Sequence, residues 1–178
     1  MATWFASVSL ALRIERTRNN MEPKRKLKID KRFQPPSFDA GDEFYPNGIF
    51  EFNITKLLAF IKANSDRFPE EEVEIETIRS FSSDNLDEST IQNANISIPI
   101  VLAEISPGRF NVIDGNHRLE NAFRRGVKKI PAFKITSEHH VVFLVSKECH
   151  KAYIEYWNSK IDIGKFEMPS KKSNILSQ

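Results

Sequence analysis

Apolar and polar residues alternate in several short stretches of the chain, as is typical of strands with one buried face. We predict strands at residues 49–54, 98–104, 109–113, 130–135 and 140–145. The turn Ser106-Pro107-Gly108 should join two of them into a hairpin, because proline fixes one backbone angle and glycine accepts a positive one. Residues 73–78 also alternate, but a helix continued from the glutamates before them is the alternative.

Apolar residues recur at helical spacing in four further segments. The first should begin at Thr55, whose hydroxyl suits a helix cap, and end before Pro69. The other helices are predicted from Asp84 or Asp87 to Ile91, from Asn116 to Arg125, and from Lys147 to Ser159. This order of strands and helices indicates an α/β (α+β) fold, a compact mixed sheet with packed helices at residues 45–160.

The helix predicted at 116–125 has a clear apolar face and a clear end. Leu119, Ala122 and Phe123 are three and four residues apart, so they should share the face that packs on the core. Gly126 follows the last turn, where a residue with a positive φ commonly ends a helix.

The segments outside this domain differ from it in composition. Residues 22–48 contain several prolines and glycines, so we expect turns and extended chain there. The first 32 residues hold nine Lys/Arg and three Asp/Glu, a net charge of +6. Residues 1–44 are therefore interpreted as a flexible basic arm and residues 161–178 as a tail. Residues 1–20, which precede Met21, are interpreted as an upstream extension outside the fold.

Charge and cysteine content bear on partners and compartment. A basic arm can hold DNA or RNA without any fold of its own, although a solvated tail is the alternative interpretation. The single cysteine, Cys149, excludes an internal disulfide and favours a cytoplasmic protein. No apolar run approaches the roughly 20 residues of a membrane-spanning helix, so we expect no membrane contact.

The chemically informative segment is Asp114-Gly115-Asn116-His117-Arg118, at the passage from a strand to a helix. Gly115 lets the backbone turn sharply and lets a ligand approach closely. The first turn of the helix presents unpaired N–H groups and the positive end of its dipole, which together attract phosphate. Arg118 adds a forked cation, His117 can move a proton, and Asp114 can hold a metal ion.

Each of these residues also has a purely structural interpretation. Asp114 can serve only as a helix cap, His117 only as a hydrogen-bonding group, and Arg118 only as the ion-pair partner of Glu120 or another acid. The pairs His139-His140 and Cys149-His150 suggest zinc, but their spacing fits no standard zinc unit, and strand-end and helix-surface histidines are the preferred interpretation.

The run from Ile113 to Ala122, with Gly126 and Ile130-Pro131-Ala132, resembles the DGxHR…A…G…(I/V)PA segment of the ParB/sulfiredoxin proteins. Pro99-Ile100-Val101-Leu102 resembles the strand that precedes it in that family. The resemblance covers about residues 97–135. It implies a ParB/sulfiredoxin-like fold and a protein that handles nucleotides or phosphoryl groups.

Departures from the family patterns narrow the choice of branch. Asn116 stands where sulfiredoxin has its catalytic cysteine, so the chain is not a true sulfiredoxin. The partition proteins carry a Gly-Glu-Arg-Arg type of turn and a following helix-turn-helix domain, for which the roughly 43 residues after Ile135 offer no clear pair of helices. At the turn the chain is most similar to the kinase branch that acts on free serine. That similarity makes Glu51 the candidate base.

The sequence thus predicts a nucleotide- or phosphate-binding protein, with a Mg²⁺-dependent phosphotransferase or NTPase activity as its extension. Gly115, Asn116, His117 and Arg118 would bind a nucleoside triphosphate or diphosphate of the ATP or CTP class, while Asp114 holds the metal ion. His117, Asp114 and Glu51 are the catalytic candidates. Two alternatives remain: a DNA- or RNA-binding ParB-like nuclease or partition factor, and a non-catalytic module switched by nucleotide.

Overall fold

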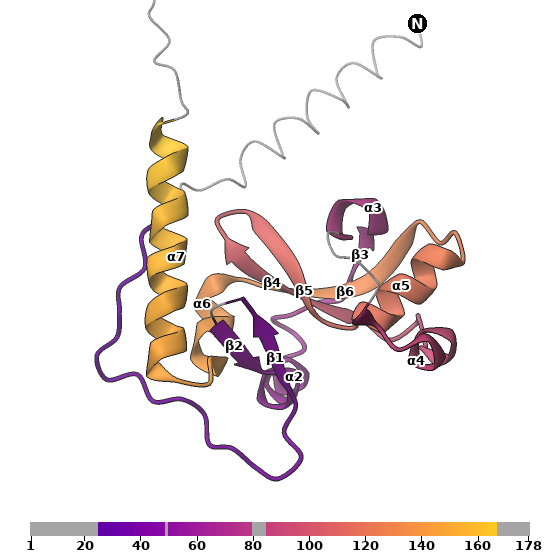
Figure 1. The fold of residues 1–178 in the computed structure, drawn as a ribbon, viewed down its shortest axis with the longest axis horizontal. Coiled ribbons are helices and arrows are strands. Elements are labelled where there is room, and N and C mark those ends of the chain that lie inside the picture. Colours follow the sequence, from indigo (N-terminus) through magenta and orange to yellow (C-terminus); the bar gives the residue numbers. More distant parts are fainter. Residues whose placement is uncertain (1–24, 49, 80–84, 167–178) are drawn as a thin grey trace, which may run out of the picture.

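The computed structural model describes residues 25–48, 50–79 and 85–166, and it confirms a mixed α/β fold (Figure 1). In chain order the elements are β1 (Phe44–Asn47), β2 (Phe50–Asn53), α2 (Ile54–Ala63), β3 (Glu71–Glu74), α3 (Ile75–Ile78), α4 (Glu88–Asn93), β4 (Ile100–Ser106), β5 (Arg109–Asp114), α5 (Asn116–Arg124), β6 (Lys129–Ile135), α6 (Ser137–His140), the 3-10 turn η2 (Val141–Phe143) and α7 (Lys147–Phe166).

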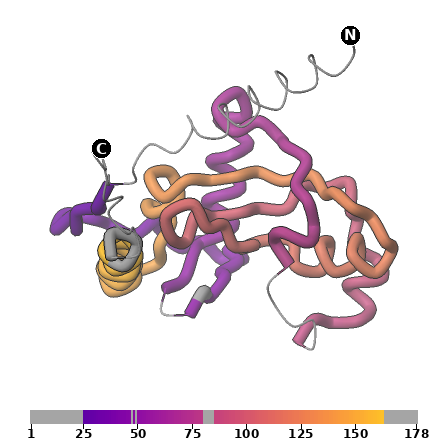
Figure 2. The backbone as a smooth tube through the Cα atoms, turned by 90° about the horizontal axis from the view of Figure 1, so that it is seen from above, coloured from indigo at the N-terminus to yellow at the C-terminus, as the bar shows by residue number. Residues whose placement is uncertain are grey.

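A four-stranded mixed sheet lies at the centre of the fold. Its strand order is β3-β6-β4-β5, with β4 parallel to β6 and the other neighbours antiparallel. All seven residues of β4 are buried, which fits the apolar run Ile100–Ala103 at its start, while Glu104 and Ser106 are buried polar residues. Figure 1 shows α7 at one end of the molecule and α4 with α5 at the other, and the view from above in Figure 2 agrees. The hairpin β1-β2 forms a separate two-stranded sheet.

The two faces of the central sheet bury separate apolar clusters. Successive side chains of a strand point to opposite faces, so adjacent residues such as Val101 and Leu102 belong to different clusters. The cluster of Val101 includes residues of β2, α2 and α7. The cluster of Leu102 lies under α3 and α5, and it includes Leu119 and Ala122. The start of α5 is thereby fixed against the sheet.

Helix α5 matches its prediction except at one residue. It spans Asn116–Arg124, and Gly126 follows it with φ 71°, as expected for a helix end. Leu119 and Ala122 are fully buried. Phe123, which was predicted to share their face, is instead 43% exposed. Its ring is covered by the guanidinium of Arg79, at 3.9 Å from the ring centroid, so it packs against a cation and not within the core.

Residues 140–145 do not form the predicted strand. They pass from α6 into the turn η2, and only Leu144 forms an isolated β-bridge, to Phe52. Helix α6 forms directly after β6. The backbone N–H groups of His139 and His140 donate to the carbonyl of Thr136, at 3.0 and 3.2 Å, so the chain is already helical where the strand was predicted to begin. Among the apolar residues that suggested a strand, Leu144 is fully buried.

Two helix starts also differ from their predictions. Asn53 caps α2, because its side chain accepts the N–H of Lys56 at 3.0 Å, whereas the hydroxyl of Thr55 accepts the N–H of Glu43. Helix α2 ends at Ala63, ahead of the predicted end near Pro69. The alternating stretch at 73–78 contains the end of a strand and a short helix. Strand β3 ends at Glu74 and helix α3 follows it, so the predicted strand holds for the first two residues and the alternative helix for the rest.

The described part of the predicted basic arm lies against α7. Its chain is extended, as expected, and Leu27 exchanges two backbone hydrogen bonds with the side chain of Asn158, at 2.8 and 3.0 Å. Phe33 is buried and stacks on His150. The predicted boundaries stay predictions, and the extension at residues 1–20 lies outside the described residues. None of the described helices combines the length and apolar composition needed to cross a membrane.

Candidate functional site

The turn between β5 and α5 has the backbone geometry that the sequence suggested. Gly115 is the N-cap of α5 and adopts the left-handed conformation, with φ 94° and ψ 24°. The first helical hydrogen bond runs from the N–H of Leu119 to the carbonyl of Gly115, at 2.9 Å. The N–H groups of residues 116–118 therefore come before the first N–H that is bonded within the helix, and they lie at the positive end of its dipole.

The side chain of Arg118 folds back over Gly115. An added Cβ at residue 115 would lie only 2.7 Å from Nη2 and 2.9 Å from Nε of Arg118. The guanidinium is thus held directly above the glycine, and Nη2 donates to Oδ2 of Asp114 at 2.7 Å. Nε is buried and has no hydrogen-bond partner among the described residues. One donor of this cation is consequently unused, at the place where the turn presents its amides.

Asp114 and Asn116 complete the polar part of the turn. Asp114 does not cap α5, because no side chain caps this helix, and its carboxylate pairs with Arg118. The pairing of Arg118 with Glu120 that the sequence allowed is absent from the described contacts. The side-chain oxygen of Asn116 is buried without a hydrogen-bond partner in the described part of the chain. Buried polar atoms are nearly always bonded, so Asn116 and Arg118 each have capacity for a polar ligand.

His117 lies close to the start of α4, a neighbour that the sequence did not indicate. Asp87 caps α4, and hydrogen bonds from the side chains of Thr90 and Ser89 lower the pKa of its carboxyl to about 2, with a smaller contribution from the charge of His117. Asp87 therefore stays ionised at neutral pH. The sequence identified Asp87 as a helix start, but only the packing of α4 on α5 brings it toward His117.

Glu120 is a second residue that sequence analysis did not single out. It is only 2% exposed, yet its charge is matched by two arginines. Arg79 donates to one carboxylate oxygen at 3.1 and 3.2 Å, and Arg124 donates to the other at 2.9 Å. Arg124 in turn binds Glu88 at the start of α4. This network fixes the outer side of α5. Glu120 therefore has a structural role, and both oxygens of its carboxylate are already paired.

Glu51 lies in a different sheet from the turn. It belongs to β2, where it pairs with Pro46, and its carbonyl accepts the N–H of Val145 at 3.1 Å. Glu51 as a residue is half-buried, and none of the described contacts joins it to Asp114, His117 or Arg118. Its part as a base therefore remains a prediction.

The described residues contain no group of three or more His, Cys, Asp or Glu side chains arranged to hold a metal ion. The histidines of the alternative zinc interpretation have other surroundings. His140 is fully buried, and its imidazole bonds to the carbonyl of Glu104 at 2.9 Å, so it is not at a strand end as proposed. His150 stacks on Phe33 at 4.2 Å between ring centroids. Both histidines have structural roles.

Comparison with known proteins supports the assignment of the family. Residues 67–144, which include the turn, match the family model described as the ParB N-terminal domain. No curated protein matched the sequence. One similar solved structure is the C-terminally truncated chromosome-partitioning protein ParB from Caulobacter crescentus, complexed with CTP-gamma-S. It is 20% identical and has a TM-score of 0.29, over 49% of this chain and 52% of that chain, so the chain spans about half of its length.

The family match, and not the likeness to this ParB structure, relates the chain to ParB proteins. The match begins at Arg67, ahead of β3, and ends at Leu144, ahead of α7. It thus encloses the whole four-stranded sheet and α5. Residues 67–144 are therefore similar to the ParB N-terminal domain, and this match supports a ParB-like assignment of that segment.

Proposed function

We propose that the turn Gly115–Arg118 binds the phosphate groups of a nucleoside triphosphate or diphosphate. One observation carries the proposal: the guanidinium of Arg118 lies over a left-handed Gly115, beside the free amides that begin α5. A cation and several N–H groups thereby converge on one place, and this combination suits phosphate oxygens. The match of the surrounding segment to the ParB N-terminal domain supports a nucleotide as the source of that phosphate.

In this proposal phosphate competes with Asp114 for Arg118. The carboxylate of Asp114 accepts from Nη2, so a bound phosphate would take over that donor and could also use the free Nε. Asp114 would then be free to hold Mg²⁺, since this ion rarely needs a cage made only of protein groups. The metal ion would neutralise phosphate charge.

His117 and Glu51 are the proposed participants in phosphoryl transfer or hydrolysis. His117 is in the first turn of α5, where its imidazole can donate a hydrogen bond to a terminal phosphate and orient it. Glu51 would accept a proton from the attacking hydroxyl or water, provided that the bound substrate bridges the space between β2 and the turn.

A thermal-shift panel tests the binding site. Wild type is heated with ATP, ADP, CTP or GTP in the presence of Mg²⁺, CTP being included because the solved ParB holds a CTP analogue. One nucleotide should raise the melting temperature, since a ligand of the folded state stabilises it. Arg118→Ala should abolish the shift. Arg125→Ala is the matched control, because it removes the same charge from the exposed far end of the same helix. This variant should keep the thermal shift.

Product analysis with the nucleotide that binds then tests catalysis. Release of phosphate, or its transfer to an added acceptor, is expected for wild type, and His117→Ala should reduce it more than it reduces binding. Binding without any product would instead establish the non-catalytic switch. No thermal shift with any nucleotide would refute the proposed site.

A second candidate function, binding of DNA or RNA, is favoured by the charges near α7. Four cations in this segment are exposed and form no ion pair with described residues: Arg25, Lys28, Lys31 and Arg32. Lys26, by contrast, pairs with Asp162. Replacing Lys28, Lys31 and Arg32 by Gln should weaken salt-dependent nucleic-acid binding, with a smaller salt slope. These substitutions are better than deleting residues 1–40, which would also remove the buried Phe33.

A further inference from the structure

Residues 25–33, here called the basic strip, run beside α7 and are fixed to it at two places (Figure 1). At the first, the side chain of Asn158 binds the backbone of Leu27. Its oxygen accepts the N–H of Leu27 at 2.8 Å, and its nitrogen donates to the carbonyl at 3.0 Å. The indole N–H of Trp157 donates to the carbonyl of Arg25 at 3.1 Å. These bonds fix the course of the main chain and leave the cationic groups free for other contacts.

The second place is a turn at residues 30–33. The N–H of Phe33 donates to the carbonyl of Asp30 at 3.1 Å, and the carboxylate of Asp30 accepts the N–H of Arg32 at 2.8 Å. An aspartate side chain that binds the backbone two residues on stabilises such a turn. Phe33 then enters the core, where its ring stacks on His150 at 4.2 Å between centroids. The basic strip is therefore held at both ends.

The unpaired cations of the strip lie between or next to these two places. Lys31 and Arg32 are the central residues of the turn, and Lys28 follows the anchored Leu27. Asp30 is the only acid of the strip, and its carboxylate is engaged by the turn. Asn158 follows His150 by about two turns of α7, so the anchors are roughly 12 Å apart. A nucleic-acid strand carries about four phosphates over that length, comparable to the number of unpaired cations.

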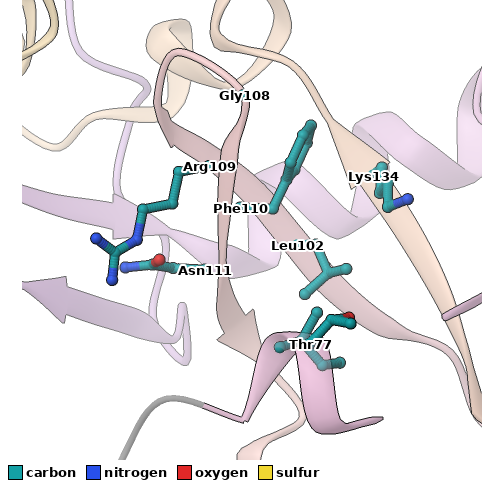
Figure 3. A pocket seen from close by; sticks show the side chains of 8 residues that line it. Thr77, Leu102, Gly108, Arg109, Phe110, Asn111 and Lys134 are labelled. Carbon is teal, nitrogen blue, oxygen red and sulfur yellow. The ribbon is translucent and has the colours of Figure 1, made fainter. Parts of the chain in front are cut away.

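The cations around the hairpin of β4 and β5 do not gather in this way. Arg109 and Lys134 both line a cavity of about 320 Å³, but Figure 3 shows that their side chains point away from each other. Lys134 also pairs with Glu71 at 3.2 Å. The basic strip is therefore the better place for a row of phosphates.

We propose that the basic strip binds the phosphate backbone of DNA or RNA as a preformed surface, and that Asn158 and Asp30 position its cations. The strip is then the site of the second candidate function, on which this proposal rests. A free arm with the same charges would lose conformational freedom on binding, which costs free energy. A strip already fixed on α7 avoids most of that cost. Asn158 and Asp30 act through the strip and do not touch the nucleic acid.

Fluorescence anisotropy of a labelled DNA duplex and of a labelled RNA of the same length, titrated with the full chain, tests this proposal. Asn158→Leu keeps the charge and nearly the size of the side chain but removes both bonds to Leu27. It should weaken binding about tenfold and speed up cleavage by trypsin after Lys28. Asn93→Leu, the same substitution at an exposed asparagine of α4, is the matched control and should bind like wild type.

Asp30→Ala and Asp30→Asn form a second matched pair, because the two variants have equal charge. Asparagine keeps an oxygen that can accept the N–H of Arg32, whereas alanine has none. Asp30→Ala should therefore bind about threefold more weakly than Asp30→Asn. A flexible arm, in which only charge matters, would give equal affinities. This pair decides between the two accounts even where Asn158→Leu does not fold.

The preformed surface and nucleic-acid binding itself fail in different ways. If Asn158→Leu binds like wild type or the two Asp30 variants bind alike, while the triple Gln variant described above binds weakly, a flexible arm is the binding element and the preformed surface is overturned. If the triple variant also binds like wild type, or wild type does not bind, the second candidate function fails as well. Arg125→Gln controls for net charge, because α5 and α7 lie at opposite ends of the molecule (Figure 1).

Discussion

At residue 115, both the backbone conformation and the available space require glycine. The φ of 94° is one that residues with a Cβ rarely adopt. An added Cβ would also lie 2.6 Å from Cγ2 of Ile100, which is fully buried and cannot yield easily. The Arg118 side chain over the glycine is flexible and could move, but only by leaving its place above the turn.

Gly115→Ala should therefore lower both stability and nucleotide binding. We expect the free energy of unfolding in urea to fall by about 2–4 kcal/mol, from the strained φ and the contact with Ile100 together. Gly41→Ala is the matched control, because Gly41 has φ 92° and nothing within 4 Å of the added Cβ. It should cost only about 1 kcal/mol. Equal losses in the two variants would contradict the contact with Ile100.

His140 should make stability depend on pH. Burial lowers the pKa of its imidazole from 6.5 to about 4, although the bond to the carbonyl of Glu104 opposes this change. The folded chain thus keeps His140 neutral while the unfolded chain takes up a proton below pH 6.5. The stability is fully present above pH 6.5 and is lost as the pH falls toward 4, by about 3 kcal/mol at most.

Urea unfolding between pH 7 and pH 4 measures this loss, with His140→Gln as the comparison. Glutamine can hydrogen-bond but cannot take up the proton, so the difference in stability between wild type and variant should shrink as the pH falls. Parallel curves for the two proteins would show that His140 does not cause the loss.

Single residues of the turn were predictable to the extent that local chemistry decides their conformation. Gly115 follows from the sharp passage between strand and helix, and Arg118 from its place in the first turn. The ion pair of Arg118 with Asp114 and the vicinity of Asp87 to His117 were not predictable, because they depend on side-chain direction and on how α4 packs on α5.

Among the elements, α5 is held at its outer side by Glu120. Glu120→Ala should lower the free energy of unfolding by about 2–3 kcal/mol, since it leaves Arg79 and Arg124 without their buried partner. Glu88→Ala removes the exposed partner of Arg124 and should cost less than about 1 kcal/mol. Chemical denaturation of both variants checks this ranking, and a larger loss for Glu88→Ala would refute it.

Elements with both an apolar face and end signals were predicted well, as β5 and α5 show. The strand predicted at 140–145 was wrong because alternation alone does not reveal whether a neighbouring strand is available to pair with it. The strand β1 was missed because Pro46 and Gly48 suggested irregular chain, whereas its pairing with β2 depends on a hairpin.

At the scale of the whole molecule, the chain before β1 contributes to the fold. Phe33→Ala should lower the melting temperature by roughly 6–20 °C, because replacing a buried phenylalanine by alanine costs about 3–5 kcal/mol. Phe38→Ala, whose side chain is 59% exposed, should change it little. Equal effects would mean that residues 25–44 do not pack stably on α7. Charge counts could not predict this docking, which depends on Phe33, Leu27 and their partners on α7.

Strand β5 begins at the β4-β5 hairpin and ends at the turn, and its pairing with β4 is irregular toward both ends, between Val101 and Leu102 and between Glu104 and Ser106. A stiff strand with irregular pairing near both ends can pass a small displacement from one end to the other. Phosphate bound at the turn would then also change how freely the hairpin moves, at the other end of the same six-residue strand.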